Sequence, residues 1–486
     1  MALSLPGKLP PIQSSTMNSI EPLELRISPA VVAAIHAGVL HIDHIPATTA
    51  DVLKVLQMAP GKFEVTDMVS ATNYGTFENV KSIDIALGDT DDTVNLQCSS
   101  DGLAGTLKIA TGPGANTVNL QGVAGSGRIG GAVTITGNAG ADALHIGGIA
   151  MKSNLTFIGN GGTDSVSGDE FIVGKTLFID NVENTTFDPI RPIVLGALNV
   201  DQDEAASAVV FILNNVVTVK GKLTYCGSPT QDDNVTLVGQ VLGPALLMLD
   251  DGINNVKLAG RMNSTLTITG GTGADTISFT DAATAFADPL ILPNQIAVHA
   301  KAVKLSLGAG ANTVNLEKAT HFYSSLAVAT GAGNDTVNFG DFFVQKDLKL
   351  SLGDGTNMVV HAFGNPGIGG AFNYIGGVDA DTVSIDQIVA DKISIKLGDG
   401  ANSVTGLARI VGKVASIIGG AGVDTLNLGL FSFDAVFTAK LGAGLDKLTY
   451  SGGAFAAVRL DGGTGDDTLV GTALLPADRK IVSFEL

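Results

Sequence analysis

The chain has 486 residues, of which 45% are hydrophobic and 15% charged, with 62 Gly and no Trp. Because Ile, Val, Leu and Phe are abundant, the composition excludes an intrinsically disordered chain and predicts a substantial buried core. The formal net charge of −19 argues against a nucleic-acid partner, which needs clustered Lys and Arg, and no apolar run reaches the ~18 residues of a transmembrane helix.

Residues 1–80 precede the regular part of the sequence, and we expect them to form an N-terminal export-like or capping segment. The stretch ISPAVVAAIHAGVL, residues 27–40, is apolar and follows Arg26. A secretory signal combines a basic region, an apolar region and a small-residue cleavage site, and this stretch carries a version of each. The alternative is a strand and a turn that enter the fold.

A Gly-rich phrase that ends in Asp or Asn recurs along most of the remaining sequence. The interval between copies is near 22 residues, which is typical of a solenoid. The interval of 69 residues after Asp164 equals three units whose middle copies lack the phrase, and the longer interval after Asp275 contains an insertion at 281–295. The residues that end the phrase are Asp92, Asn116, Asp142, Asp164, Asp233, Asn254, Asp275, Asn312, Asp335, Asn357, Asp381, Asn402, Asp424, Asp446 and Asp467.

Apolar and polar residues alternate on both sides of each phrase, as in LKLSL at 348–352 and TVNL at 313–316. Such alternation predicts half-buried strands, and the Gly-rich break predicts a turn, since Gly tolerates a positive φ. Units this short leave no room for a crossover helix. We therefore predict an all-β protein, a right-handed parallel β-helix (β-solenoid) of about 17 coils over residues 81–475, with a C-terminal cap at 476–486.

In such a solenoid the residues that end the phrase lie above one another at the strand spacing of ~4.8 Å. Stacked Asn side chains can form an amide ladder, whereas stacked Asp side chains repel and need neutral neighbours, protonation or a cation. Asn and Asp alternate from Asn312 to Asp424, and then Asp424, Asp446 and Asp467 follow in three successive coils. This C-terminal trio is our first choice for a bound ion.

The phrases at 270–275, 419–424 and 462–467 resemble the Gly-Gly-x-Gly-x-Asp nonapeptide of RTX, or haemolysin-type, calcium-binding repeats. In that family, loop carbonyls and Asp carboxylates of adjacent coils hold Ca²⁺. Here the phrase occurs once per coil rather than in direct tandem. The alternative is that each Asp only forms a turn by bonding to its own backbone. The Ca²⁺ ligands that the resemblance implies are Asp424, Asp446, Asp467, Asp466, Asp275, Asp335 and Asp381.

A longer resemblance covers almost the whole chain. The stretches IEPLELRISPA at 20–30 and GTFENVKSIDIALGDTDDTVNL at 75–96 are similar to segments of large exported bacterial proteins that carry degenerate repeats of the calcium-binding kind. The resemblance implies an extracellular or cell-surface location, with contacts to the cell envelope, the matrix or polysaccharide.

From these features we expect a structural or interaction protein rather than an enzyme. The alternative is a carbohydrate-active parallel β-helix enzyme, a lyase or hydrolase, which needs paired carboxylates or a basic residue in a groove. The Arg residues are widely dispersed, and the carboxylates lie mostly in the repeated corner. A groove with several carboxylates outside that corner would favour the enzyme.

Overall fold

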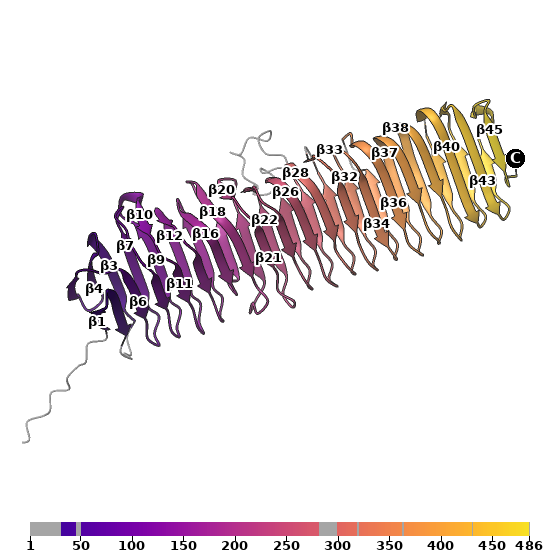
Figure 1. Cartoon of the computed structure of the whole chain (residues 1–486). Coiled ribbons are helices and arrows are strands. Elements are labelled where there is room, and N and C mark those ends of the chain that lie inside the picture. The colour runs from indigo at the N-terminus through magenta and orange to yellow at the C-terminus, as the bar shows by residue number, and fades with distance from the viewer. Residues whose placement is uncertain are drawn as a thin grey trace, which may run out of the picture.

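The computed structural model describes residues 31–44, 50–280, 299–317, 320–361, 364–429 and 431–485. The described chain forms one elongated stack of strands (Figure 1), with two 3₁₀ turns, η1 (Val123–Gly125) and η2 (Thr472–Leu474). The phrase at 20–30 and the insertion at 281–295 lie outside the described residues.

The strands follow one another around three faces, and each strand pairs in parallel with its equivalents in the coils before and after it. The first face holds β6 (Ser82–Ala86), β8 (Leu107–Ala110), β11 (Val133–Thr136), β14 (Leu155–Ile158), β21 (Leu223–Cys226), β24 (Ala245–Met248), β31 (Leu326–Ala329), β34 (Leu348–Gly353), β43 (Ala457–Thr464) and β45 (Arg479–Val482).

The second face begins directly after the Gly-rich turns. It holds β7 (Thr93–Cys98), β9 (Thr117–Gly122), β12 (Ala143–Gly147), β15 (Ser165–Asp169), β17 (Asn184–Phe187), β19 (Val209–Leu213), β22 (Asp233–Leu237), β25 (Asn255–Leu258), β27 (Thr276–Phe279), β29 (Thr313–Leu316), β32 (Thr336–Phe339), β35 (Met358–His361), β39 (Thr425–Leu428), β41 (Lys447–Tyr450) and β44 (Thr468–Val470).

The third face holds the shortest strands, and several longer strands bend from it onto the first face. The short strands are β10 (Gly127–Ile129), β13 (Ile149–Met151), β20 (Val217–Val219), β23 (Gln240–Val241), β30 (Thr320–Phe322), β33 (Phe342–Val344) and β42 (Gly453–Ala454). The bent strands are β16 (Ile172–Asp180), β18 (Ile193–Asp201), β26 (Arg261–Thr269), β28 (His299–Ser306), β36 (Gly367–Gly376) and β40 (Phe431–Ala443), while β37 (Thr382–Lys396) and β38 (Ser403–Ile418) cover all three faces.

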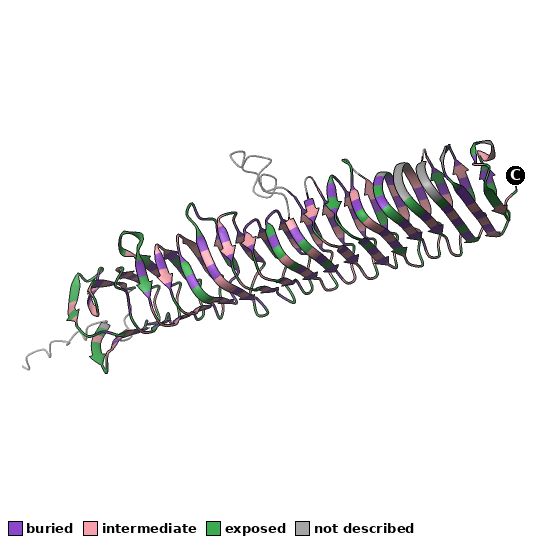
Figure 2. Cartoon of the chain, turned by 45° about the horizontal axis from the view of Figure 1, so that its top comes forward, coloured by how far each residue is buried: buried purple, intermediate pink, exposed green. Residues whose placement is uncertain are grey.

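The predicted β-solenoid is confirmed, with about 16 turns of near 22 residues. Alternate residues of each strand point inward, so buried and exposed residues alternate along the ribbon (Figure 2). Equivalent aliphatic side chains lie in register, as Leu426 does over Leu448, and both are buried. Fully burying a side chain of this size contributes about 1.5–3 kcal/mol, and the repetition of such columns holds the stack together.

An antiparallel unit closes the N-terminal end. The hairpin of β1 (Val31–His36) and β2 (Val39–His44) and the meander of β3 (Val52–Ala59), β4 (Lys62–Asp67) and β5 (Thr72–Phe77) are antiparallel. The inner strands β2 and β3 pair in parallel with β6 and β7. This unit therefore covers the strand edges of the first coil, which would otherwise be open to pairing with another chain.

Candidate functional sites: a buried Asp/Asn column and an outer groove

The Asp and Asn residues that end the Gly-rich phrase form a column inside the solenoid, at the start of the second face. The column is interrupted between Asp164 and Asp233, where Val209 is in register with Asp233. All 15 of them expose at most 1% of their surface. The sequence placed them at turns but did not predict their burial. Each lies at, or immediately before, the first residue of a strand, and its side chain points inward together with the buried aliphatic residues that follow.

One side-chain oxygen of each column residue except Asp233 accepts a hydrogen bond from the preceding coil; Oδ1 of Asp233 accepts the Tyr225 hydroxyl hydrogen of its own coil at 2.9 Å. The backbone N–H of Asp335 donates to Oδ1 of Asn357 at 3.1 Å, and that of Asn357 donates to Oδ1 of Asp381 at 3.0 Å. Asn lies over Asp rather than over Asn in the column, and Nδ2 of Asn312 and Asn402 also donates to Oδ1 of the Asp in the next coil, at 3.0 and 2.9 Å. Such a bond stabilises the fold by about 0.5–1.5 kcal/mol, and by more when the acceptor is charged.

Asn residues also close their own turn. Nδ2 of Asn357 donates to the carbonyl oxygens of Gly353 at 3.1 Å and Gly355 at 3.0 Å. Asn402 makes the same pair of bonds, to Gly398 and Gly400. An ionised Asp has no hydrogen to donate at this position, so Asp and Asn are not equivalent in the column.

The second oxygen of most Asp residues in the column is buried without a hydrogen-bond partner. Asp381 differs, since its Oδ2 accepts the Tyr374 hydroxyl hydrogen at 2.8 Å. A buried acceptor that lacks a partner costs about 1–3 kcal/mol. The column residues whose Oδ2 has no partner among the described atoms are Asp164, Asp233, Asp275, Asp335, Asp424, Asp446 and Asp467.

Burial favours the protonated form of these carboxyl groups. It raises the pKa of Asp164 and Asp233 to about 7 and the pKa of Asp275 and Asp424 to about 6. Burial and, secondarily, the neighbouring carboxylate of Asp467 raise the pKa of Asp446. A proton on Oδ2 would turn this unpaired acceptor into a hydrogen-bond donor. Protonation is therefore one way for the buried carboxyl groups to gain the missing hydrogen bond.

The structure places the predicted metal ligands as follows. Asp424, Asp446 and Asp467 occupy three successive coils, joined by bonds from Asp424 N–H to Asp446 Oδ1 at 2.7 Å and from Asp446 N–H to Asp467 Oδ1 at 2.9 Å. Asp466 is exposed and lies outside the column. The remaining predicted ligands lie in the column but are separated by Asn residues; they are Asp275, Asp335 and Asp381.

Calcium takes six to eight oxygen ligands, and the trio offers one enclosed, partnerless carboxylate oxygen per coil. These oxygens are donors of the type that Ca²⁺ prefers. Within the described parts of the chain, however, no three His, Cys, Asp or Glu side chains form a group that could hold a metal ion. The trio therefore fits a cation only if turn carbonyls complete the ligand set.

The residue five positions before the column residue differs between several Asp coils and several Asn coils. Asn312, Asn357 and Asn402 follow a Leu at this position, whereas Asp275, Asp381 and Asp424 follow a Gly. A Cβ on Gly270, Gly376 or Gly419 would lie 1.8 to 1.9 Å from Oδ2 of the Asp in its own coil. In these three Asp coils a side chain is excluded at that position, and in the three Asn coils it is admitted; Asp92, which follows Leu87, and Asp335, which follows Thr330, do not follow this pattern.

Asp446 breaks this pairing, because Leu441 precedes it. Leu441 is fully buried, as the Leu residues of the Asn coils are. Asp446 thus has the same buried Leu neighbour as Asn312, Asn357 and Asn402.

Glu183 belongs to the column, although no Gly-rich phrase marks its coil. Its Oε2 accepts the backbone N–H of Asp164 at 2.8 Å, and its Oε1 accepts that of Ala206 at 2.9 Å. The coil that it closes is shorter than the others, so the longer side chain of Glu spans the step. Sequence reasoning missed this residue because both the period and the phrase fail there.

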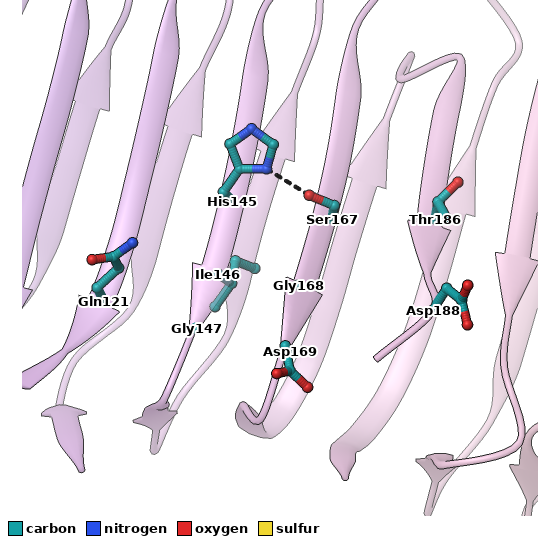
Figure 3. A pocket seen from close by; sticks show the side chains of 9 residues that line it. All are labelled: Gln121, His145, Ile146, Gly147, Ser167, Gly168, Asp169, Thr186 and Asp188. Carbon is teal, nitrogen blue, oxygen red and sulfur yellow. Dashed lines mark hydrogen bonds between the residues drawn. The ribbon is translucent and has the colours of Figure 1, made fainter. Parts of the chain in front are cut away.

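A second candidate site is an open groove on the outside of the rod, far in sequence from the trio. Two adjoining hollows of about 380 and 430 Å³ share Gln121, Gly147 and Asp169. Figure 3 shows the polar side chains that neighbouring strands contribute to the first hollow. They are Gln121 of β9, His145 of β12, Ser167 and Asp169 of β15, Thr186 of β17, and Asp188, which follows β17.

Hydrogen bonds and ion pairs fix several of these groups. Nδ1 of His145 lies 2.6 Å from the hydroxyl oxygen of Ser167. The backbone N–H of Arg191 donates to Oδ1 of Asp169 at 2.8 Å, and the Arg191 guanidinium pairs with Glu170. Glu170 has a left-handed backbone with φ of 53°, a conformation that is uncommon for residues other than Gly and concentrates at functional sites.

No sequence signal identified this groove. Its residues come from different coils, and none belongs to the Gly-rich phrase. The usable signal was Gly147, which lies in a strand where the coils before and after carry Gln121 and Asp169, since Gly within a strand often marks a close approach or a ligand site.

Comparison with known proteins finds no family model and no curated protein that matches the chain. None of the helical segments in the described ranges is long and apolar enough to cross a membrane.

Proposed function

We propose that this protein is an exported or cell-surface rod with a structural or interaction role. The observation that supports the proposal best is the continuity of the core. Each coil is joined to its neighbours by parallel strands, by aliphatic columns and by the Asp/Asn column, so the rod needs no other component to stay folded. About 16 turns at ~4.8 Å per turn span about 77 Å, a length suited to presenting side chains along extended faces.

The export part of the proposal rests on the resemblance described above. It is tested by surface proteolysis of intact cells that produce the tagged full-length chain. Extracellular protease removes the tag if the protein is at the cell surface. Protection of the tag until the cells are lysed contradicts a surface location.

Calcium binding by Asp424, Asp446 and Asp467 is the second part of the proposal. The unpaired Oδ2 atoms of three successive coils support calcium binding. A cation shared between them would offset the cost of their burial, as a proton would. Calorimetric Ca²⁺ titration of a chelator-treated sample tests this directly. We expect heat of binding that Asp467→Asn reduces and that Asp335→Asn, a matched change in the alternating part of the column, leaves unchanged. No heat at millimolar Ca²⁺ contradicts this part alone.

Folding does not depend on the metal in this account, because the aliphatic columns supply most of the buried surface. Circular dichroism in calcium and in excess chelator should give the same strand signal, with a higher melting temperature in calcium only if the ion binds. Loss of the strand signal on chelation would instead make the chain a metal-dependent folding module.

A carbohydrate-active enzyme is the second candidate, and the outer groove favours it. Asp169, Glu170 and Asp188 are carboxylates outside the column, gathered in one groove. Release of reducing ends from neutral polysaccharides, or of unsaturated products from uronate-containing ones, tests this candidate. Absence of both products contradicts catalysis and leaves the rod proposal untouched.

A further inference from the structure

The outer groove owes its depth to the absence of one side chain. Gly147 lies in an outward-facing row, in register with Gln121 of the preceding coil and Asp169 of the next. A Cβ at Gly147 would approach nothing closer than the Asp169 carbonyl oxygen, at 3.9 Å. The fold therefore does not require glycine at this position. The glycine leaves a gap between the side chains of the preceding and following coils in this row.

The glycines beside it have a different role. A Cβ at Gly122 would lie 1.8 Å from the Gly148 carbonyl oxygen, and one at Gly148 would lie 2.7 Å from Cα of Gly125. These residues bring three backbone segments into contact and form a wall of the groove. These distances leave no room for a side chain at Gly122 or Gly148.

The groups that face the groove can both donate and accept hydrogen bonds. His145, Ser167 and Thr186 stand in register on adjacent strands and form one row. Gln121 and Asp169 flank the gap at Gly147 in the second row. Hydroxyl, imidazole, amide and carboxylate groups in this mixture suit a ligand with many hydroxyl groups, each of which donates and accepts.

The charge of the groove disfavours acidic ligands. The charged side chains that line the two hollows are the three carboxylates of Asp169, Glu170 and Asp188 and the guanidinium of Arg191. Arg191 is already paired with Glu170. A phosphate or an acidic sugar would meet excess negative charge without a free guanidinium to neutralise it.

The backbone of the groove disfavours an added peptide strand. The strand at its centre, β12, pairs in parallel with β9 on one side and β15 on the other. Because those ladders use its N–H and C=O groups, no free edge is available for β-augmentation. A ligand has to bind through its own side groups instead. The polar groups span four strands, which corresponds to about 14 Å at ~4.8 Å per step.

We propose that this groove binds a neutral, linear oligosaccharide that lies along the rod across β9, β12, β15 and β17. Its hydroxyl groups contact the row of His145, Ser167 and Thr186, and one sugar ring occupies the gap above Gly147. This inference shares its ligand class with the enzyme candidate but requires no turnover, and it is independent of the rod and calcium proposals.

Calorimetric titration with hexasaccharides tests the inference. The neutral probes are cellohexaose, xylohexaose and maltohexaose; the charged comparators are hexagalacturonate and the chitosan hexamer. We expect at least one neutral probe to bind with a Kd below 1 mM. Gly147→Val should weaken this binding at least tenfold, because the new side chain fills the gap while suiting a strand.

The matched control is Thr134→Val, on β11 of the first face in the same part of the rod. It should leave the affinity unchanged. Circular dichroism and melting temperature verify that both variants keep the fold. The inference is overturned if no neutral probe binds at millimolar concentration, if only charged probes bind, or if binding persists in a folded Gly147→Val variant. None of these results bears on the chelation and calcium tests of the rod.

Discussion

At the scale of single residues, the column shows why Asp and Asn are used differently in otherwise similar turns. Both accept a backbone N–H from the preceding coil, but only Asn donates to its own turn carbonyls. Asp275, Asp381 and Asp424 instead place their second oxygen beside a glycine. The alternation of the two residues therefore separates like charges and also fits two different turn interiors.

The buried carboxyl groups make stability depend on pH. Burial raises the pKa of Asp164 and Asp233 to about 7 in the folded protein, above the value of about 3.9 for an exposed Asp. Proton binding thus favours the folded state, and this contribution is complete below about pH 4 and is lost as the pH rises through 7. We predict a higher melting temperature at pH 5 than at pH 8.

Differential scanning calorimetry across this range checks the prediction. Relief of general repulsion at a net charge of −19 acts in the same direction, so the control is the double variant Asp164→Asn and Asp233→Asn. Its melting temperature should change less between the two pH values. A wild-type melting temperature that increases towards pH 8 contradicts the account.

Asp446 provides a second test at this scale, since it has the same buried Leu neighbour as Asn312, Asn357 and Asn402. Asp446→Asn should raise stability at pH 8 by about 1 kcal/mol, because the amide can donate to turn carbonyls as Asn402 does. The reciprocal change, Asn402→Asp, should lower stability by about 1–3 kcal/mol by leaving a buried acceptor without a partner. Denaturant unfolding of both variants measures the difference. Equal effects of the two changes would mean that the surroundings do not distinguish Asp from Asn.

At the scale of the turn and its strand, close contacts explain why the Gly-rich phrase needs glycine at certain positions. A Cβ at Gly419 would lie 1.9 Å from Oδ2 of Asp424 and 2.2 Å from the Leu441 carbonyl oxygen. Gly419→Ala should therefore cost about 1–3 kcal/mol, as overpacking does. Gly147→Ala, in open space, should change stability by no more than about 0.5 kcal/mol. Thermal unfolding compares the pair, and similar losses in both would refute the steric explanation.

The strands themselves were predictable, because the alternation of apolar residues marks both their positions and their inward faces. The burial of the column could also have been inferred. Asp424, Leu426 and Leu428 are two residues apart and so share a face of the chain. Glu183 and the groove could not be predicted in this way. The role of Glu183 depends on a shortened coil. The groove arises where side chains of four strands surround the position of Gly147, which has no side chain.

At the scale of the whole molecule, the repeat fixes the architecture. A period near 22 residues without helices leaves stacked parallel strands as the solution, and the structure has about 16 such turns. The ends were less predictable, because they depart from the repeat. The antiparallel strands β1 to β5 cover the N-terminal end, and β45 pairs with β43 at the other.

Residues one period apart lie directly above each other in the solenoid, and the formation of a disulfide between paired cysteines tests this stacking. Asn427 and Thr449 are in register on β39 and β41, so their Cα atoms are separated by one strand spacing, ~4.8 Å, within the range for a disulfide. Asn427→Cys with Thr449→Cys should form an intramolecular disulfide under mild oxidation. Asn427→Cys with Lys447→Cys, offset by two residues, should not. A disulfide in the offset pair and not in the aligned pair would contradict the stacking on which the column, the rod and the groove all depend.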